Sequence, residues 1–297
     1  MHWFDTHAHL DGFAAEGRVP EILARAAAAG VTHICAVGGT PAGNDCAVQL
    51  ARQHPGHLHA AVGLDRDQAE RPRDAEASAA LAELAADSAV VAIGETGLDY
   101  YYSADTAPAQ RALFEDMLAL ALRARKPVIV HSRYADADTI AMLTDFSTAW
   151  KKLFHSVEKS EKTFPYRGKN EPNFPHCGKP AENASAPPPP GVLHCFTGDA
   201  DFAAELAALG FFISFSGIVT FNNADPLRAV ARDVPAEQVL VETDCPYLTP
   251  KPFRGRVNEP AYVAHVGERM AEVRGVPAAD MAALTTANAR RLFQLEK

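Results

Sequence analysis

Two histidines separated by one residue lie near the start of the chain, in the segment Asp5-Thr6-His7-Ala8-His9. The segment is typical of an extended strand, in which alternate side chains share a face. The imidazoles of His7 and His9 would then point the same way, as nitrogen ligands of a divalent metal ion do. Asp5 would sit beneath them as a supporting or capping group. An isolated pair is more often two ordinary polar side chains, so the metal hypothesis depends on further ligands.

Further imidazoles and carboxylates stand where short apolar runs end. They are Glu95 after Val90–Ile93, His131 after Pro127–Val130, His194 after Val192–Leu193, and Glu242 and Asp244 at the end of Val239–Glu242. A buried histidine bonded to backbone, or a carboxylate that caps the next helix, would be the simpler interpretation of any one of them. This interpretation does not explain all of these residues together, because buried charge without a partner is energetically costly and several strand ends would have to carry charge or imidazole by accident. We therefore predict one shared metal site.

The predicted ligands are more numerous than one catalytic ion needs if positions stay open for water and substrate. They are His7, His9, Glu95, His131, His194 and Asp244. Two ions bridged by a carboxylate fit better, and would lower the pKa of a shared water and neutralise charge on a phosphoryl or carbonyl oxygen. Mixed imidazole and carboxylate ligands suit Zn, Mn, Co or Fe, and Mg also stays open.

Two carboxylates at the last apolar run are candidates for catalysis, beside Glu95. Asp244 is placed to hold one ion and to accept the proton of the attacking water. Glu242 lies two positions earlier on the same face of the strand. It either orients that water or is a buried carboxylate satisfied by backbone or by arginine.

The elements that would position these residues alternate between apolar runs and amphipathic stretches rich in Ala, Leu and Glu. The predicted strands are Trp3–Asp5, Thr32–Val37, His59–Val62, Val90–Ile93, Pro127–Val130, Val192–Leu193, Phe211–Phe215 and Val239–Glu242. The predicted helices are Pro20–Ala29, Asp45–Gln53, Ala75–Ala86, Ala107–Arg125, Ala135–Trp150, Asp201–Leu209 and Leu227–Asp233, with one or two more after Glu259. This order favours an α/β fold, a closed (β/α)8 TIM barrel, whose active sites lie at the carboxyl ends of the strands.

One interval, at about 147–190 between the fifth and sixth strands, interrupts the alternation. It is rich in Lys, Asn, Glu and Pro and ends in Pro187-Pro188-Pro189-Pro190, so it cannot be helical throughout. We expect a single barrel domain over 1–297 with a partly irregular insertion here. His155, His176 and Cys177 could form an additional metal site, but a solvated loop is favoured, since zinc sites usually show closely paired ligands.

Composition limits the classes to which the protein can belong. With 297 residues and 47% hydrophobic content the chain can bury a large core. Its five scattered cysteines argue against a disulfide framework, and no segment is typical of a membrane span or a signal peptide, so a cytoplasmic protein is expected. The net charge of −9 argues against a protein that holds nucleic acid through a broad basic surface, so metal ions and a few local cations would contact a polyanionic substrate. The sequence indicates no oligomeric state.

Several motifs occur in one order along the chain. They are His7-x-His9, Gly94-Glu95-Thr96-Gly97-Leu98-Asp99-Tyr100-Tyr101, His131-Ser132-Arg133, His194-Cys195-Phe196-Thr197-Gly198, Glu242-Thr243-Asp244, Pro246-Tyr247-Leu248, Arg254-Gly255 and Asn258-Glu259-Pro260. In these motifs the chain resembles the TatD family of metal-dependent deoxyribonucleases, of the amidohydrolase-like superfamily, over nearly its whole length outside the insertion. The resemblance implies an amidohydrolase-like barrel, two divalent ions and hydrolysis of DNA phosphodiester bonds, often from the 3′ end.

The same resemblance divides the ligands between two ions. It implies that His7, His9, Glu95 and Asp244 hold one ion and that Glu95, His131 and His194 hold the other, so that Glu95 bridges them. Two features depart from the family pattern. Where the family commonly has Gly-x-His-Pro, this chain has Gly63-Leu64-Asp65-Arg66, which replaces an imidazole by a charge pair and puts phosphate contacts there in question. The insertion beside the site would narrow, cover or re-specify the cleft.

Candidate contacts to DNA follow from residue type and position. Arg133 lies two residues past a ligand, and Lys251, Arg254 and Arg256 cluster after the last strand, where they would hold phosphates or be ordinary surface charges. Tyr100, with Tyr101 and Tyr102, would stack on bases at the edge of the cleft or pack the loop.

The leading hypothesis is an enzyme, a metal-dependent deoxyribonuclease that acts as a 3′–5′ exonuclease on single-stranded DNA or on 3′ ends. Two alternatives stay open. One is a barrel hydrolase of a small amide, lactone or phosphoester, although such barrels often bridge their metals with a modified lysine where this chain has Glu95. The other is a non-catalytic, metal-stabilised scaffold whose insertion binds a protein partner.

Overall fold

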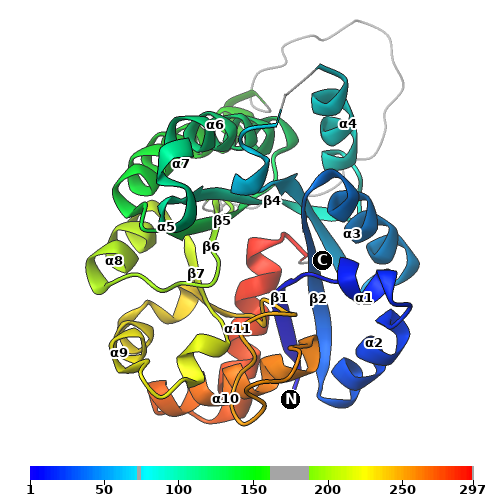
Figure 1. Cartoon of the computed structure of the whole chain (residues 1–297). Coiled ribbons are helices and arrows are strands. Elements are labelled where there is room, and N and C mark those ends of the chain that lie inside the picture. Colours follow the sequence, from blue (N-terminus) through cyan, green and yellow to red (C-terminus); the bar gives the residue numbers. More distant parts are fainter. Residues whose placement is uncertain (72–74, 161–186, 296–297) are drawn as a thin grey trace, which may run out of the picture.

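Eight parallel strands form a ring with helices outside it in the computed structural model, which describes residues 1–71, 75–160 and 187–295 (Figure 1). The strands are β1 (Trp3–Ala8), β2 (Val31–Gly39), β3 (Leu58–Leu64), β4 (Val90–Asp99), β5 (Val128–Arg133), β6 (Gly191–Leu193), β7 (Phe212–Phe215) and β8 (Val239–Val241). Each pairs with the next in chain order. The predicted (β/α)8 TIM barrel, with an insertion between the fifth and sixth strands, is confirmed.

The ring closes between β8 and β1 only near their carboxyl ends. Ala8 and Cys245 form a parallel bridge there. The amide of His9 donates to the carbonyl oxygen of Cys245 at 2.8 Å, and the amide of Asp244 donates to the carbonyl oxygen of His7 at 2.9 Å. The closure therefore fixes the backbone of three predicted metal ligands relative to one another.

Helices cover the outside of the ring. They are α1 (Asp11–Ala15), α2 (Val19–Ala28), α3 (Pro41–Gln53), α4 (Ala75–Ala85), α5 (Tyr100–Ser103), α6 (Ala107–Ala124), α7 (Asp136–Ser160), α8 (Ala200–Leu209), α9 (Asp225–Asp233), α10 (Val263–Arg274) and α11 (Ala278–Leu292). Local sequence sets several bounds. Asp199, for example, accepts a hydrogen bond from the amide of Phe202 and so caps α8, which ends at Gly210 in the left-handed conformation.

An apolar cluster fills the interior of the barrel. It joins one side chain from most strands, including Phe4, Ile129 and Phe212, to Leu292 and Phe293 at the end of α11. Figure 1 shows α11 crossing the ring of strands. Because Phe4 stands near the start of β1, α11 covers the amino-terminal end of the barrel, and the polar residues that follow the strands lie at the opposite end.

The helix after β5 is longer than expected. It does not end at Trp150 but continues to Ser160, so the expected start of the insertion at about 147 lies inside α7. Ser147 donates to the carbonyl oxygen of Leu209 at 2.8 Å, and the buried Trp150 donates to that of Pro188 at 2.7 Å. An amphipathic helix with one packed face can carry the polar composition that indicated a loop.

The additional metal site considered in the insertion lies outside the residues that the structure describes. The side chain of His155 and residues His176 and Cys177 are not among the described parts of the chain. The other four cysteines are free thiols. Among the helices described, none is long and apolar enough to cross a membrane.

Candidate metal centre

All of the predicted metal ligands meet at the carboxyl end of the barrel. They are His7 on β1, His9 just after β1, Glu95 on β4, His131 on β5, His194 directly after β6, and Asp244 shortly after β8. Their donor atoms form three overlapping sets, of which two share Glu95 and the third joins His7, His194 and Asp244. Because Asp244 also lies near His9 Nε2, the side chains can be divided into two donor groups that share Glu95. Sequence reasoning placed these residues at strand ends, and the barrel brings those ends together.

The first donor group contains His7, His9, Glu95 and Asp244. The Nε2 atoms of His7 and His9 are 3.2 Å apart. Each of them lies near Glu95 Oε2, at 3.4 Å from His7 and 3.5 Å from His9, and near Asp244 Oδ1, at 3.8 and 3.6 Å respectively.

The second donor group contains Glu95, His131 and His194. Glu95 uses its other oxygen here, and Oε1 lies 3.4 Å from His131 Nδ1 and 3.2 Å from His194 Nε2. Those two nitrogens are 3.3 Å apart. The rings of His7 and His194 stack with centroids 4.0 Å apart, so the two donor groups adjoin.

The spacing of these donor atoms fits divalent ions. Ligands about 2.1 Å from a tetrahedral ion stand about 3.4 Å from one another. The distances within the two groups run from 3.2 to 3.8 Å. Imidazole and carboxylate donors are also the types that Zn, Mn, Co and Fe accept. The residues present therefore fit two ions with Glu95 between them.

The electrostatics of the site favour the ligand forms of His7 and Glu95, whereas neighbouring carboxylates raise the pKa values of His9 and His194 despite their burial. Burial lowers the pKa of His7 to about 4, aided by the nearby His194. Burial alone would raise the pKa of Glu95, but the imidazoles of His194 and His7 hold it well below its ordinary value. At neutral pH His7 is therefore a neutral donor and Glu95 is ionised. Burial raises the pKa of Asp244 to about 7, and a divalent cation beside it would favour its ionised form.

Two glycines allow Glu95 to reach the centre. β4 extends to Asp99, well past the expected end at Ile93, because Gly94 and Gly97 adopt φ angles of +149° and +133° and continue the strand. A Cβ atom on Gly94 would lie 2.5 Å from the carbonyl oxygen of Ile129, and one on Gly97 would lie 2.0 Å from that of His131. The glycines on either side of Glu95 thus let β4 pass close to β5.

Glu242 lies behind His194, not at the mouth of the barrel. It is fully buried, its Oε1 is 3.4 Å from His194 Nδ1, and the same oxygen accepts a hydrogen bond from the amide of Cys195 at 2.6 Å. Glu95 contacts the other nitrogen of the His194 ring. This position corresponds to the buried alternative, in which the backbone satisfies one oxygen of the carboxylate, and not to a carboxylate at the mouth of the barrel.

Two further aspartates support the centre. Asp99, which sequence reasoning did not assign, lies with Oδ2 3.1 Å from His131 Nε2, the nitrogen that faces away from Glu95. A carboxylate in that position fixes the orientation of a metal-binding imidazole. Asp5 is buried beneath the site, as expected, and accepts hydrogen bonds from the amide and hydroxyl of Thr243 at 2.8 and 2.6 Å. It therefore ties β1 to the segment that carries Asp244.

Three of the basic residues expected to contact phosphates are exposed, and each contacts another residue of the chain. Lys251 binds the side-chain oxygen of Asn222. Arg254 donates to the carbonyl oxygen of Thr249 at 3.0 Å and lies over the ring of Phe221. Arg256 lies 5.6 Å from the centroid of the Phe253 ring. These three residues belong to one loop after β8, at the same end of the barrel as the metal centre.

The aromatic residues at the mouth differ in part from those expected. The hydroxyl of Tyr100 donates to Asp138 on α7 at 2.6 Å, so this ring is held against a helix. Tyr101 is instead 52% exposed, with the guanidinium of Arg133 3.9 Å from its centroid. Tyr134 is 75% exposed and stands 5.4 Å from Tyr101. The side chain of Tyr102 is outside the description.

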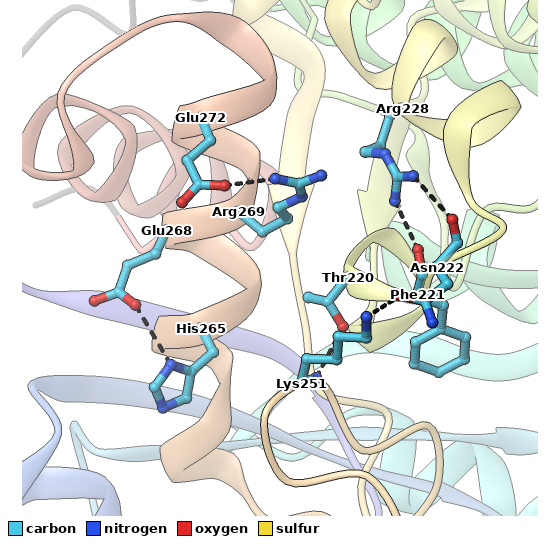
Figure 2. A pocket seen from close by; sticks show the side chains of 9 residues that line it. All are labelled: Thr220, Phe221, Asn222, Arg228, Lys251, His265, Glu268, Arg269 and Glu272. Carbon is cyan, nitrogen blue, oxygen red and sulfur yellow. Dashed lines mark hydrogen bonds and ion pairs between the residues drawn. The ribbon is translucent and has the colours of Figure 1, made fainter.

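A cavity of about 400 Å³ lies between α9 and α10, and Lys251 reaches it from the loop after β8. Figure 2 shows that acidic and basic side chains within it pair with one another. Arg269 donates to Glu272 at 2.6 Å, and His265 Nδ1 lies 3.4 Å from Glu268. None of the predicted metal ligands lines the cavity, so it is separate from the metal centre.

The departure after β3 brings a cation to the metal centre. Arg66 begins a short 3-10 turn, Arg66–Gln68, directly after Asp65. Its Nη1 atom lies 3.6 Å from Glu95 Oε1, and its Nε atom lies 3.7 Å from Asp99 Oδ2. The motif that put phosphate contacts in question therefore places a guanidinium beside Glu95, the carboxylate that the two donor groups share.

Comparisons with known proteins point to metal-dependent hydrolases. The family model described as TatD related DNase matches residues 4–294. The metal-dependent hydrolase YcfH of Escherichia coli K12 is 40% identical over 100% of this chain and 97% of its own length. The 3′-5′ ssDNA/RNA exonuclease TatD of Edwardsiella piscicida is 32% identical, over 98% of this chain and 99% of its own. The crystal structure of YjjV, a TatD homolog from E. coli K12, superposes with a TM-score of 0.77 at 27% identity, covering 99% of this chain and 98% of that one.

Proposed function

The chain belongs to the TatD-related DNase family of metal-dependent hydrolases, and from that premise we propose that it removes nucleotides from the 3′ end of single-stranded DNA with two divalent ions. One observation carries the proposal: the two oxygens of Glu95 each belong to a different donor group. The relative named as a 3′-5′ ssDNA/RNA exonuclease supports the substrate and the direction of cleavage.

Ions bound in the two donor groups supply positive charge for a phosphoryl oxygen and lower the pKa of a water molecule. The other steps belong to the chain. Asp244, whose carboxylate is partly exposed beside His7 and His9, accepts a proton from the attacking water. The water oxygen forms a bond to phosphorus while one P–O ester bond breaks, and the leaving oxygen takes up the proton held by Asp244, which leaves an alcohol and a phosphomonoester.

The aromatic and basic residues at the mouth hold the strand. The exposed rings of Tyr101 and Tyr134 stack on bases, which is tolerant of sequence, and Arg133 adds a charge beside them. The loop with Lys251, Arg254 and Arg256 contacts phosphates further along the strand. This division suits an acidic chain, because only a few local cations touch the substrate.

Digestion of single-stranded oligonucleotides labelled at the 5′ or the 3′ end, with metal analysis of the protein and a series of divalent ions, tests the proposal. We expect a ladder of shortened products from the 5′-labelled strand and immediate loss of the 3′ label, both dependent on the ion. Rapid turnover of small esters or lactones with intact oligonucleotides would support the small-molecule hydrolase instead. A protein that binds metal and turns over neither substrate would support the scaffold.

The Asp244→Asn variant tests the proton acceptor. We expect cleavage to fall by about 100-fold or more, because an amide cannot accept the proton. Asp201→Asn on the exposed face of α8 makes the same chemical change away from the centre and should cleave normally. Unchanged cleavage by Asp244→Asn would remove Asp244 from this role.

A further inference from the structure

The turn that follows β3 is held rigidly by the aspartate at its start. Asp65 accepts a hydrogen bond from the amide of Asp67 at 2.9 Å and one from the side chain of Gln68 at 3.3 Å. Its own amide donates to the carbonyl oxygen of Gly39 at 2.9 Å. Asp65 therefore caps the turn, and the turn fixes the position from which the Arg66 side chain extends.

The guanidinium of Arg66 has attractive neighbours but no hydrogen bond to any residue that the structure describes. Its three ion pairs, with Glu95, Asp99 and Asp67, span 3.6 to 3.7 Å, which is too long for a hydrogen bond. A guanidinium carries five N–H donors in a planar fork. With the side chain 24% exposed, these donors border the mouth of the barrel beside the second donor group.

A group of this kind fits a phosphate better than it fits its present neighbours. Glu95 and Asp99 both make short contacts with imidazoles, so neither carboxylate is placed to accept two parallel hydrogen bonds from the guanidinium of Arg66. A phosphate oxygen at the second donor group would lie within reach of the fork and would accept charge-assisted hydrogen bonds from it. The fixed turn means that little conformational freedom is lost on binding.

We propose that Arg66 binds a non-bridging oxygen of the scissile phosphodiester and stabilises the charge that develops there during attack. The proposal rests on the proposed function and adds a catalytic residue to it. Asp65 stands where the family pattern has His, and Arg66 stands where it has Pro, so the cation comes from the residue after the one that replaces the imidazole. Because arginine side chains stay protonated in proteins, phosphate binding through this contact should persist at alkaline pH.

Equilibrium binding of inorganic phosphate to the metal-loaded protein, measured by calorimetry at pH 7 and pH 9, tests Arg66 without turnover. We expect Arg66→Gln to weaken binding about 10- to 100-fold at both values, Arg66→Lys to recover part of the loss, and the metal content to stay unchanged. Arg52→Gln, which removes the same charge from an exposed pair with Asp87, should bind like the parent protein. Lower metal content with unchanged phosphate affinity would show that Arg66 only balances the charge of Glu95, and would overturn the proposal.

Oligonucleotides with a normal or a methylphosphonate terminal linkage locate the contact on the substrate. The methylphosphonate lacks one charged oxygen, so Arg66→Gln should reduce kcat/KM about 10- to 100-fold for the normal linkage and much less for the neutral one. Equal losses on both substrates would overturn the assignment to the scissile phosphate. If the parent protein binds phosphate through Arg66 but cleaves no DNA, Arg66 is a phosphate-binding residue, while its role in DNA cleavage and the proposed function both fail.

Discussion

The imidazoles of His131 and His194 each meet a carboxylate at the ring nitrogen that faces away from Glu95. For His131 the partner is Asp99, and for His194 it is Glu242. A carboxylate behind a ligand fixes the tautomer and orientation of the ring and raises its basicity. The second donor group is therefore oriented by residues that never touch an ion.

Replacing Glu242 by glutamine should weaken metal binding at the second donor group. Glutamine keeps an acceptor for the amide of Cys195 but removes the negative charge beside His194, and partners of this kind contribute about 10- to 100-fold to metal affinity. Titration of the metal-free protein with a divalent ion measures the change. Glu237→Gln, at an exposed position before β8, serves as the matched control. Equal affinities for the two variants would contradict the positioning role.

Residue type and location made the convergence of the donor side chains predictable, whereas the surroundings of other residues did not follow from the sequence. An imidazole after a strand has few alternatives once several strands show one. The contact of Arg66 with Glu95 depends on a turn capped by Asp65, and no local pattern indicates which way that turn points the side chain. The sequence also did not indicate that Tyr101, and not Tyr100, is the exposed ring at the mouth, because successive side chains of the helix α5 point in different directions.

At the level of elements, β4 is the strand on which the centre depends. It is buried along its whole length and carries Glu95 in its middle. Gly97 pairs with His131 across the β4–β5 ladder, where the two strands approach closely. The distance between the side chains of Glu95 and His131 is thus set by a backbone contact.

A methyl group at position 97 should disturb that contact. Its Cβ would lie 2.0 Å from the carbonyl oxygen of His131, and the φ angle of +133° is unfavourable for alanine. We expect Gly97→Ala to lower the free energy of unfolding by about 1–3 kcal/mol and to reduce metal content. Denaturant unfolding and metal analysis report the two effects. Gly12→Ala in α1, where a Cβ meets no atom within 4 Å, should lower neither the free energy of unfolding nor the metal content, and a Gly97→Ala protein with full metal content would contradict this role of Gly97.

The existence and order of the strands followed from the apolar runs, but some bounds did not. β4 passes through Gly94-Glu95-Thr96-Gly97, a segment that reads as the end of a strand because glycine is rare inside one. α7 continues past Trp150 because that residue is buried and bonded to Pro188, a contact between segments far apart in the sequence. Tertiary contacts decided both bounds, and local patterns do not contain them.

On the scale of the whole molecule the two ends of the barrel differ in chemistry. Ionised and metal-binding groups gather at the carboxyl end. At the amino-terminal end, His33 and His59 stack on Phe4, which also packs against Phe293 after α11. His59 Nε2 lies 3.3 Å from His33 Nδ1, and Arg290 contacts the other nitrogen of His33. These imidazoles lie at the end of the barrel opposite the candidate metal centre, so we expect them to affect stability and not catalysis.

The histidines at the amino-terminal end should make the barrel sensitive to acid. Burial lowers the pKa of His59 to about 4, and the nearby charges of His33, His57 and Arg290 act in the same direction. The unfolded chain binds a proton near pH 6.5, whereas the folded protein binds it only near pH 4, so stability present above pH 6.5 is lost as the pH falls toward 4. For His59 this loss amounts to about 2–3 kcal/mol between pH 7.5 and 4.5. Urea unfolding of the metal-free protein should show a correspondingly smaller loss in His59→Gln, while His2→Gln, at an exposed position, should lose as much as the parent. Equal losses in His59→Gln and the parent protein would mean that His59 is charged in the folded barrel.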